Sequence, residues 1–153
     1  MSRTLDTQAE YGVIAALLND ASCFDRVSSV VTPKDFSATT NRTLYSVIAS
    51  MILACKPVDV LTVLSQLKAQ GIETIDASHL LEIAQSAASP RHAKRYAEAV
   101  RIASLERQLR AAIAQADEIV EGDGDLSERT EAIAALFSGI AHRPNRRAPR
   151  HVS

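Results

Sequence analysis

Apolar residues recur along this chain at the three- and four-residue spacing of an amphipathic helix, and no segment sustains the alternation of a half-buried strand. The pattern predicts an all-helical fold with short turns between helices. A short helix is expected to begin near Ser22, and a longer one to run from about 41 to 54. The inward-facing positions of the first half are Val13, Ile14, Leu17 and Leu18, then Phe24 and Val27, then Leu44, Val47, Ile48 and Met51, and finally Val60, Val63, Leu64 and Leu67.

Helix boundaries are marked by residues that can pair with the free backbone groups of a first or last turn. Thr7-Gln8-Ala9-Glu10 has the form of a capping box, so the first helix is expected to begin there. Thr32-Pro33 and Ser89-Pro90 each place a capping residue before a proline, which suits the first helical position. Further helix starts are indicated at Asp59 and at Asp76 or Ser78, and a helix end at Gly71.

The second half predicts a helical hairpin. After Pro90, no glycine or proline interrupts the apolar spacing up to about Glu121. Gly122-Asp123-Gly124-Asp125 then turns the chain, and a return helix follows, so the two helices are expected to pack antiparallel. The expected organisation is a compact helical head at 1–89, a hairpin at 90–141 and a disordered basic tail or linker at 142–153.

The hairpin carries more apolar positions than two paired helices need between themselves. Such a surplus is usually buried against another chain, and the alternative is that the head folds back over it. We therefore expect an oligomer or partner interface at Tyr96, Val100, Leu109, Ile113, Ile133 and Phe137.

Composition narrows the class of protein. Hydrophobic residues make up 46% of the chain and aromatic residues 4%, which favours an aliphatic core. The net charge of −1 gives no overall attraction to nucleic acid or to an anionic membrane. Cys23 and Cys55 lie far apart among apolar or small residues and are expected to be buried reduced thiols. The first residues include no apolar run, so a cytoplasmic protein is expected.

Residue patterns for catalysis or cofactor binding are missing from this sequence. None of its five glycines precedes a lysine, as the end of a phosphate-binding loop requires. The four histidines lack zinc-ligand spacing, and no Gly-x-Ser-x-Gly motif occurs. Carboxylates such as Glu10, Asp35 and Asp59 are explained by helix starts. We expect no catalytic residue, no cofactor and no metal, and a small helical enzyme is the least supported reading.

The order of segments resembles the amino-terminal domain of DnaB-type replicative helicases from about residue 7 to 140. The opening helix of that family is similar to Gln8–Leu18, and an acidic residue followed by Phe matches Asp35-Phe36. Lys56-Pro57-Val58-Asp59-Val60, before a helix that ends at Gly71, is the strongest match. Phe24–Val27, Asn41–Tyr45 and Ser89–Val100 continue the resemblance.

One local departure and one missing domain limit what the resemblance implies. Many members carry paired glycines and Tyr-Leu where this chain has Asp76-Ala77-Ser78-His79-Leu80. The RecA-like motor that follows the domain in helicases is not part of this sequence, so ATP hydrolysis and translocation do not carry over. The resemblance implies a collar domain that pairs with other copies through its hairpin and binds primase or a helicase loader. An excised helicase segment and a free-standing phage-type or plasmid-type loader or regulator both fit.

A different reading is a helical DNA-binding regulator. Its support is the closely spaced arginines Arg143, Arg146, Arg147 and Arg150, which could contact phosphates or a protein partner. The preceding helices show no turn with a basic recognition helix, so direct DNA contact is expected to be weak or absent.

Overall fold

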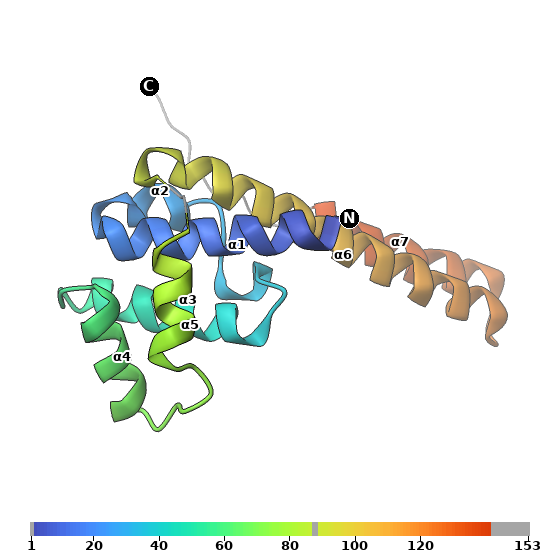
Figure 1. Ribbon diagram of the computed structural model, residues 1–153. Coiled ribbons are helices and arrows are strands. Elements are labelled where there is room, and N and C mark those ends of the chain that lie inside the picture. Colours follow the sequence, from blue (N-terminus) through green and yellow to red (C-terminus); the bar gives the residue numbers. More distant parts are fainter. Residues whose placement is uncertain (1, 87–88, 142–153) are drawn as a thin grey trace. The chain divides into compact units, whose positions relative to one another are not determined.

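The computed structural model describes residues 2–86 and 89–141, and every regular element within these ranges is a helix (Figure 1). The predicted all-helical class is confirmed. The α-helices are α1 (Ser2–Asn19), α2 (Phe24–Ser28), α3 (Thr39–Leu53), α4 (Val60–Ala69), α5 (Ala77–Ala84), α6 (Ala93–Glu121) and α7 (Leu126–Ala141). Single 3₁₀ turns lie at Ala21–Cys23, Pro33–Asp35 and Pro90–His92.

Two compact units divide the chain after Arg101. We call residues 1–101 the head unit and residues 102–153 the hairpin unit. The sequence predicted the division at 89/90 instead. The observed boundary lies within α6 because Ala93, Ala97 and Val100 are buried members of the head unit's core. The first turns of α6 thus complete the head.

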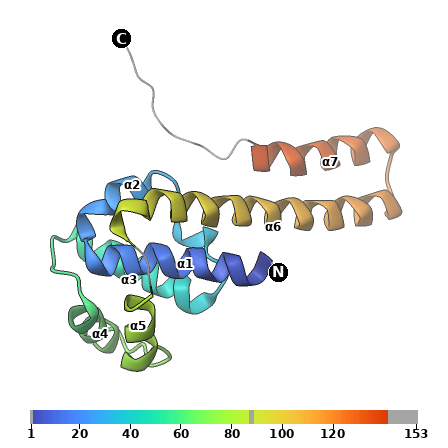
Figure 2. The same cartoon turned by 45° about the horizontal axis from the view of Figure 1, so that its top comes forward.

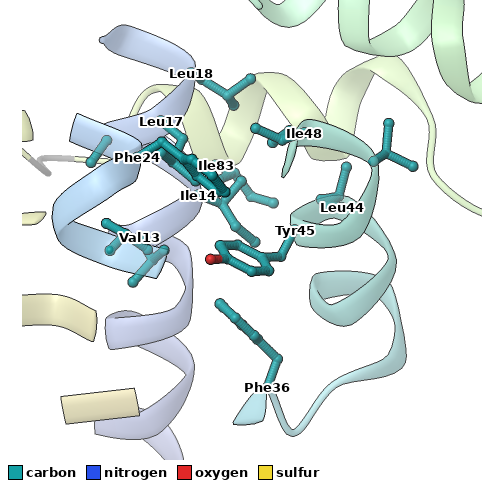
Figure 3. Close-up of a cluster of buried hydrophobic side chains, with 14 of the residues drawn as sticks. Val13, Ile14, Leu17, Leu18, Phe24, Phe36, Leu44, Tyr45, Ile48 and Ile83 are labelled. Carbon is teal, nitrogen blue, oxygen red and sulfur yellow. The ribbon is translucent and has the colours of Figure 1, made fainter. Parts of the chain in front are cut away.

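The core of the head unit lies between α1, α3 and α5 (Figure 3). Leu17 and Ile48 are fully buried there, as the helical spacing predicted. The Tyr45 ring stacks on Phe36 with ring centroids 4.9 Å apart, and the ring of Phe24 lies 6.3 Å from it. Three of the chain's six aromatic residues therefore gather at one point of the core.

Helix α1 and the start of α6 pack unusually closely. A Cβ atom added at Gly12 would lie 2.8 Å from Cγ of Tyr96, closer than side-chain atoms tolerate. Glycine at this position lets the tyrosine ring lie against the backbone of α1. The Arg101 guanidinium, at the end of the same segment, donates to the carbonyl of Val30 at 3.3 Å. These contacts tie the first turns of α6 to the head unit.

Most predicted helix boundaries are confirmed by hydrogen bonds. The Asp59 carboxylate accepts from the amide of Thr62 at 2.8 Å, and that of Asp76 from the amide of His79 at 2.9 Å. Gly71 has a φ of +73°, the left-handed conformation that follows a helix end. The capping residues at Thr32 and Ser89 each stand before a proline in the first position of a 3₁₀ turn.

The predicted capping box at Thr7–Glu10 is wrong. Helix α1 begins at Ser2, because residues 2–6 contain neither glycine nor proline to stop it. Glu10 is instead buried, and its carboxylate accepts from the amide and hydroxyl of Ser37, both at 2.8 Å, and from the amide group of Asn41 at 2.9 Å. The carboxylate therefore fixes α1 to the start of α3.

The two cysteines differ in environment, so the prediction that both are buried is wrong for one of them. Cys23 is buried, and this burial raises the pKa of its thiol. Cys55 lies beyond the end of α3, where its side chain is exposed.

We expect iodoacetamide to modify Cys55 near neutral pH and to leave Cys23 unmodified until the protein unfolds. The raised pKa keeps Cys23 in the unreactive thiol form, and its burial excludes the reagent. Mass spectrometry of the digested protein measures both sites. Modification of Cys23 in the folded protein at the rate of Cys55 would contradict the burial of Cys23 at the end of the 3₁₀ turn before α2.

No helix within the described residues is long and apolar enough to cross a membrane.

Candidate interaction surface on the hairpin unit

The second half of α6 and the whole of α7 form an antiparallel hairpin, as predicted from the sequence. Figure 2 shows α7 running back alongside α6 after the turn. Gly124 has a φ of +115°, and the Arg129 side chain donates to the carbonyl of Gly124 at 3.1 Å and to that of Val120 at 2.8 Å. Arg129 thereby satisfies a carbonyl that the end of α6 leaves unpaired.

A stripe of large apolar side chains runs along α6 and stays open to solvent. We call it the α6 stripe, and its members are Ile102, Leu109, Ile113 and Val120. At 3.6 residues per turn these four positions point within about 40° of one another. Each side chain is between 45% and 58% exposed, although it lies on a helix that already has a partner. A monomer rarely leaves such a continuous apolar line uncovered.

The structure divides the six predicted interface residues into three groups. Leu109 and Ile113 lie on the α6 stripe. Ile133 and Phe137 are partly buried on α7. Tyr96 and Val100 belong to the head unit, where Tyr96 packs against the core and Val100 is only 1% exposed. We leave these last two out of the candidate surface, because the chain itself covers Val100 and partly covers Tyr96.

The predicted interface left out Ile102 and Val120, although the helical spacing puts Val120 on the same side of the helix as Leu109 and Ile113. It also left out Leu126, which is 69% exposed at the start of α7. The seven-residue intervals from 102 to 109 and from 113 to 120 carry the signal that would have found the first two. The arginines at 143, 146, 147 and 150 lie outside the described residues.

The tip of the hairpin is strongly acidic. Residues 117–131 contain seven carboxylates and one arginine, and all seven acidic side chains are exposed. Arg107 and Arg110 lie further from the tip on α6. The hairpin therefore has a negative end, and any chain that covers the α6 stripe must accommodate it.

Chemically, this surface is suited to non-covalent association. Among the described residues no three His, Cys, Asp or Glu side chains are grouped so as to hold a metal ion. The hairpin surface combines the apolar α6 stripe with a charged tip, and both kinds of surface occur in protein–protein contacts.

A family model for the DnaB-like helicase N-terminal domain matches residues 3–102, about two thirds of the chain. The chain belongs to this family. The matched segment ends one residue beyond the head unit, so it covers nearly all of the head and leaves out the rest of the hairpin unit. The resemblance drawn from the sequence is thereby confirmed.

A solved structure extends the likeness into the hairpin. The N-terminal domain of DnaB helicase from Mycobacterium tuberculosis matches with a TM-score of 0.81. The match covers 87% of this chain and 96% of that one, at 21% sequence identity. At that identity the comparison shows a shared fold, and it includes much of the DnaB-like hairpin as well as the head.

Proposed function

We propose that this chain is a non-catalytic assembly and partner-binding domain in DNA replication, which pairs with other copies through its hairpin and receives a helicase, primase or loader protein. The observation that carries the proposal is the exposed α6 stripe on a DnaB-like N-terminal domain. The role is that of a collar: it holds copies together and presents their heads to partners.

Covering the α6 stripe supplies the driving force for pairing. A leucine, isoleucine or valine side chain contributes about 1.5–3 kcal/mol when it goes from full exposure to full burial, before the cost of association. The side chains of the stripe are about half exposed, so each contributes roughly half of that. A second copy offers the same stripe, so a twofold contact can cover both at once. Four such side chains on each copy form an apolar centre suited to this contact.

Charge restricts how two hairpins can pair. Two acidic tips placed together would bring seven carboxylates of each copy against the other seven, which is strongly repulsive. We therefore infer that the copies place their tips apart, with each tip nearer the basic part of the partner's α6.

Mixing the chain with purified DnaB-type helicase, primase and helicase loader tests the partner-binding part. We expect co-elution with at least one of them in size-exclusion chromatography, together with a change in helicase unwinding rate where the helicase is bound. The Ile113→Asp variant separates binding through the hairpin from binding through the head. Absence of a complex and of any change in unwinding with all three proteins would contradict this part of the proposal.

The sequence also predicts that the chain does not bind ATP through a phosphate loop. Mg-ATP is expected to leave the thermal midpoint unchanged. A ligand present at about a hundredfold over its dissociation constant would add about 2.7 kcal/mol to the free energy of unfolding, which differential scanning calorimetry detects readily. A reproducible rise in the midpoint would overturn this prediction.

A further inference from the structure

A second apolar surface lies on the head unit, between α4 and α5. The two helices pack against each other in opposite directions (Figure 1). Near the loop that joins them is a pocket of about 260 Å³. Its charged lining residues are Lys68, Glu73 and Asp76, and its apolar lining is Leu64, Leu67, Ile72, Ile75 and Ala77. The pocket is a hollow in the surface of the head unit that no described side chain fills.

Two exposed leucines extend this pocket along the helix pair. Leu61 precedes Leu64 by one turn of α4 and is 74% exposed, and Leu81 follows Ala77 by one turn of α5 and is 45% exposed. Both leucines lie one turn from lining residues of the pocket, on two helices that pack against each other. We call the pocket together with Leu61 and Leu81 the α4–α5 groove.

Acidic side chains outnumber basic ones around this groove. Residues 58–86 contain four carboxylates and a single lysine, and all five charged side chains are exposed. They are Asp59, Glu73, Asp76, Glu82 and Lys68. This segment is more negative than the chain as a whole, whose net charge is −1. A second copy of the same acidic groove would be repelled, whereas a cationic partner would be attracted.

We propose that the α4–α5 groove binds a cationic amphipathic helix of a protein partner, with leucine-like side chains at helical spacing in the groove and Lys or Arg at its rim. Helices of this kind lie in grooves through anchors three or four residues apart, and the pocket beside Leu64 receives one such anchor. This gives the partner-binding part of the proposed function a location and a chemical class, and it rests on that proposal.

A pair of synthetic peptides tests the binding mode. Each is a labelled amphipathic helix of about fifteen residues, long enough to have helical character, with leucines on one face. One carries lysines beside the leucines, and the other carries glutamates in the same positions. Fluorescence anisotropy with the full chain is expected to give about tenfold tighter binding of the lysine peptide. This preference should shrink at high salt, since added ions screen exposed charges.

Variants of the chain locate the site. Leu61→Asp and Leu81→Asp are expected to weaken binding of the lysine peptide at least about tenfold, because each places a carboxylate against an apolar anchor. Leu53→Asp is the matched control, since Leu53 is also 74% exposed but lies at the end of α3. Circular dichroism checks that all three variants keep their helical content.

Each other outcome overturns the proposal. If the lysine peptide does not bind, the groove is not a binding site, and if both peptides bind equally, the site has no charge selectivity. If only Leu53→Asp or Ile113→Asp loses binding, the peptide binds another surface. Loss of self-association in Leu61→Asp would show that a second copy covers the groove. If only hairpin variants lose self-association while the peptide still fails to bind, the proposed pairing survives and the groove does not.

Discussion

Replacing Ile113 with aspartate is expected to dissociate the copies of this chain while leaving each copy folded. Ile113 is 56% exposed at the middle of the α6 stripe, so a carboxylate there is tolerated in the monomer. In a pairing that covers the stripe, the same carboxylate would be buried without a partner. That costs at least about 2 kcal/mol, which weakens association roughly 30-fold or more. Light scattering measures the mass, and circular dichroism of the same sample measures helical content.

Ala111→Asp is the matched control for this variant. Ala111 is exposed on α6, nearly opposite Ile113 around the helix, and the substitution adds the same charge. We expect it to leave association nearly unchanged. Equal assembly of wild type and Ile113→Asp would place the interface elsewhere. Loss of both assembly and helical content would show that Ile113 belongs to the monomer's own core.

Tyr45→Ala is expected to cause the largest loss of stability in the head unit. The ring is 2% exposed and stacks on Phe36, so its removal leaves a cavity at the aromatic centre of the core. Truncations of this size typically cost about 3–5 kcal/mol in free energy of unfolding, a large share of a domain's stability. Urea unfolding followed by circular dichroism measures the loss. Tyr45→Phe keeps the ring, and a similar loss in both variants would show that stacking is not what holds α3.

The same side chain gives the head unit a dependence on alkaline pH. Burial, and to a lesser extent the charge of Asp35, raises the pKa of the Tyr45 hydroxyl well above its ordinary value. A raised pKa means that the unfolded chain releases this proton first, so stability is full below about pH 10 and falls as the pH rises further. The Tyr45→Phe variant is expected to lose less stability than wild type over that range. Parallel losses in both proteins would contradict a buried hydroxyl.

Helix positions were predictable from the sequence because their signals are local. Asp59, Asp76 and Gly71 act on backbone groups within four residues, and the structure confirms all three. The prediction at Thr7–Glu10 was wrong because the contacts that decide it are far apart in the sequence. A Thr three residues before a Glu looks the same inside a helix as at its start, and what decides the role of Glu10 is its contact with Ser37 and Asn41, far along the chain.

The candidate surface was predictable only in part. Helical spacing shows which side chains share a face, and Leu109 and Ile113, which it grouped, are both exposed on α6. It cannot show which apolar residues are already covered. Tyr96 and Val100 continue the same helix, yet they pack into the head unit, and Gly12 is what lets the tyrosine approach α1. The α4–α5 groove was missed because its two sides come from different helices.

Sedimentation equilibrium of the unmodified chain measures whether copies associate reversibly, which pairing through the α6 stripe requires. The monomer mass is 16.5 kDa. Over concentrations from about 1 to 100 µM, which span typical affinities of weak to moderate protein contacts, we expect the apparent mass to rise to at least twice the monomer value. In the same range Ile113→Asp should stay near the monomer mass. A wild-type mass that stays at 16.5 kDa at every concentration would contradict pairing through the α6 stripe.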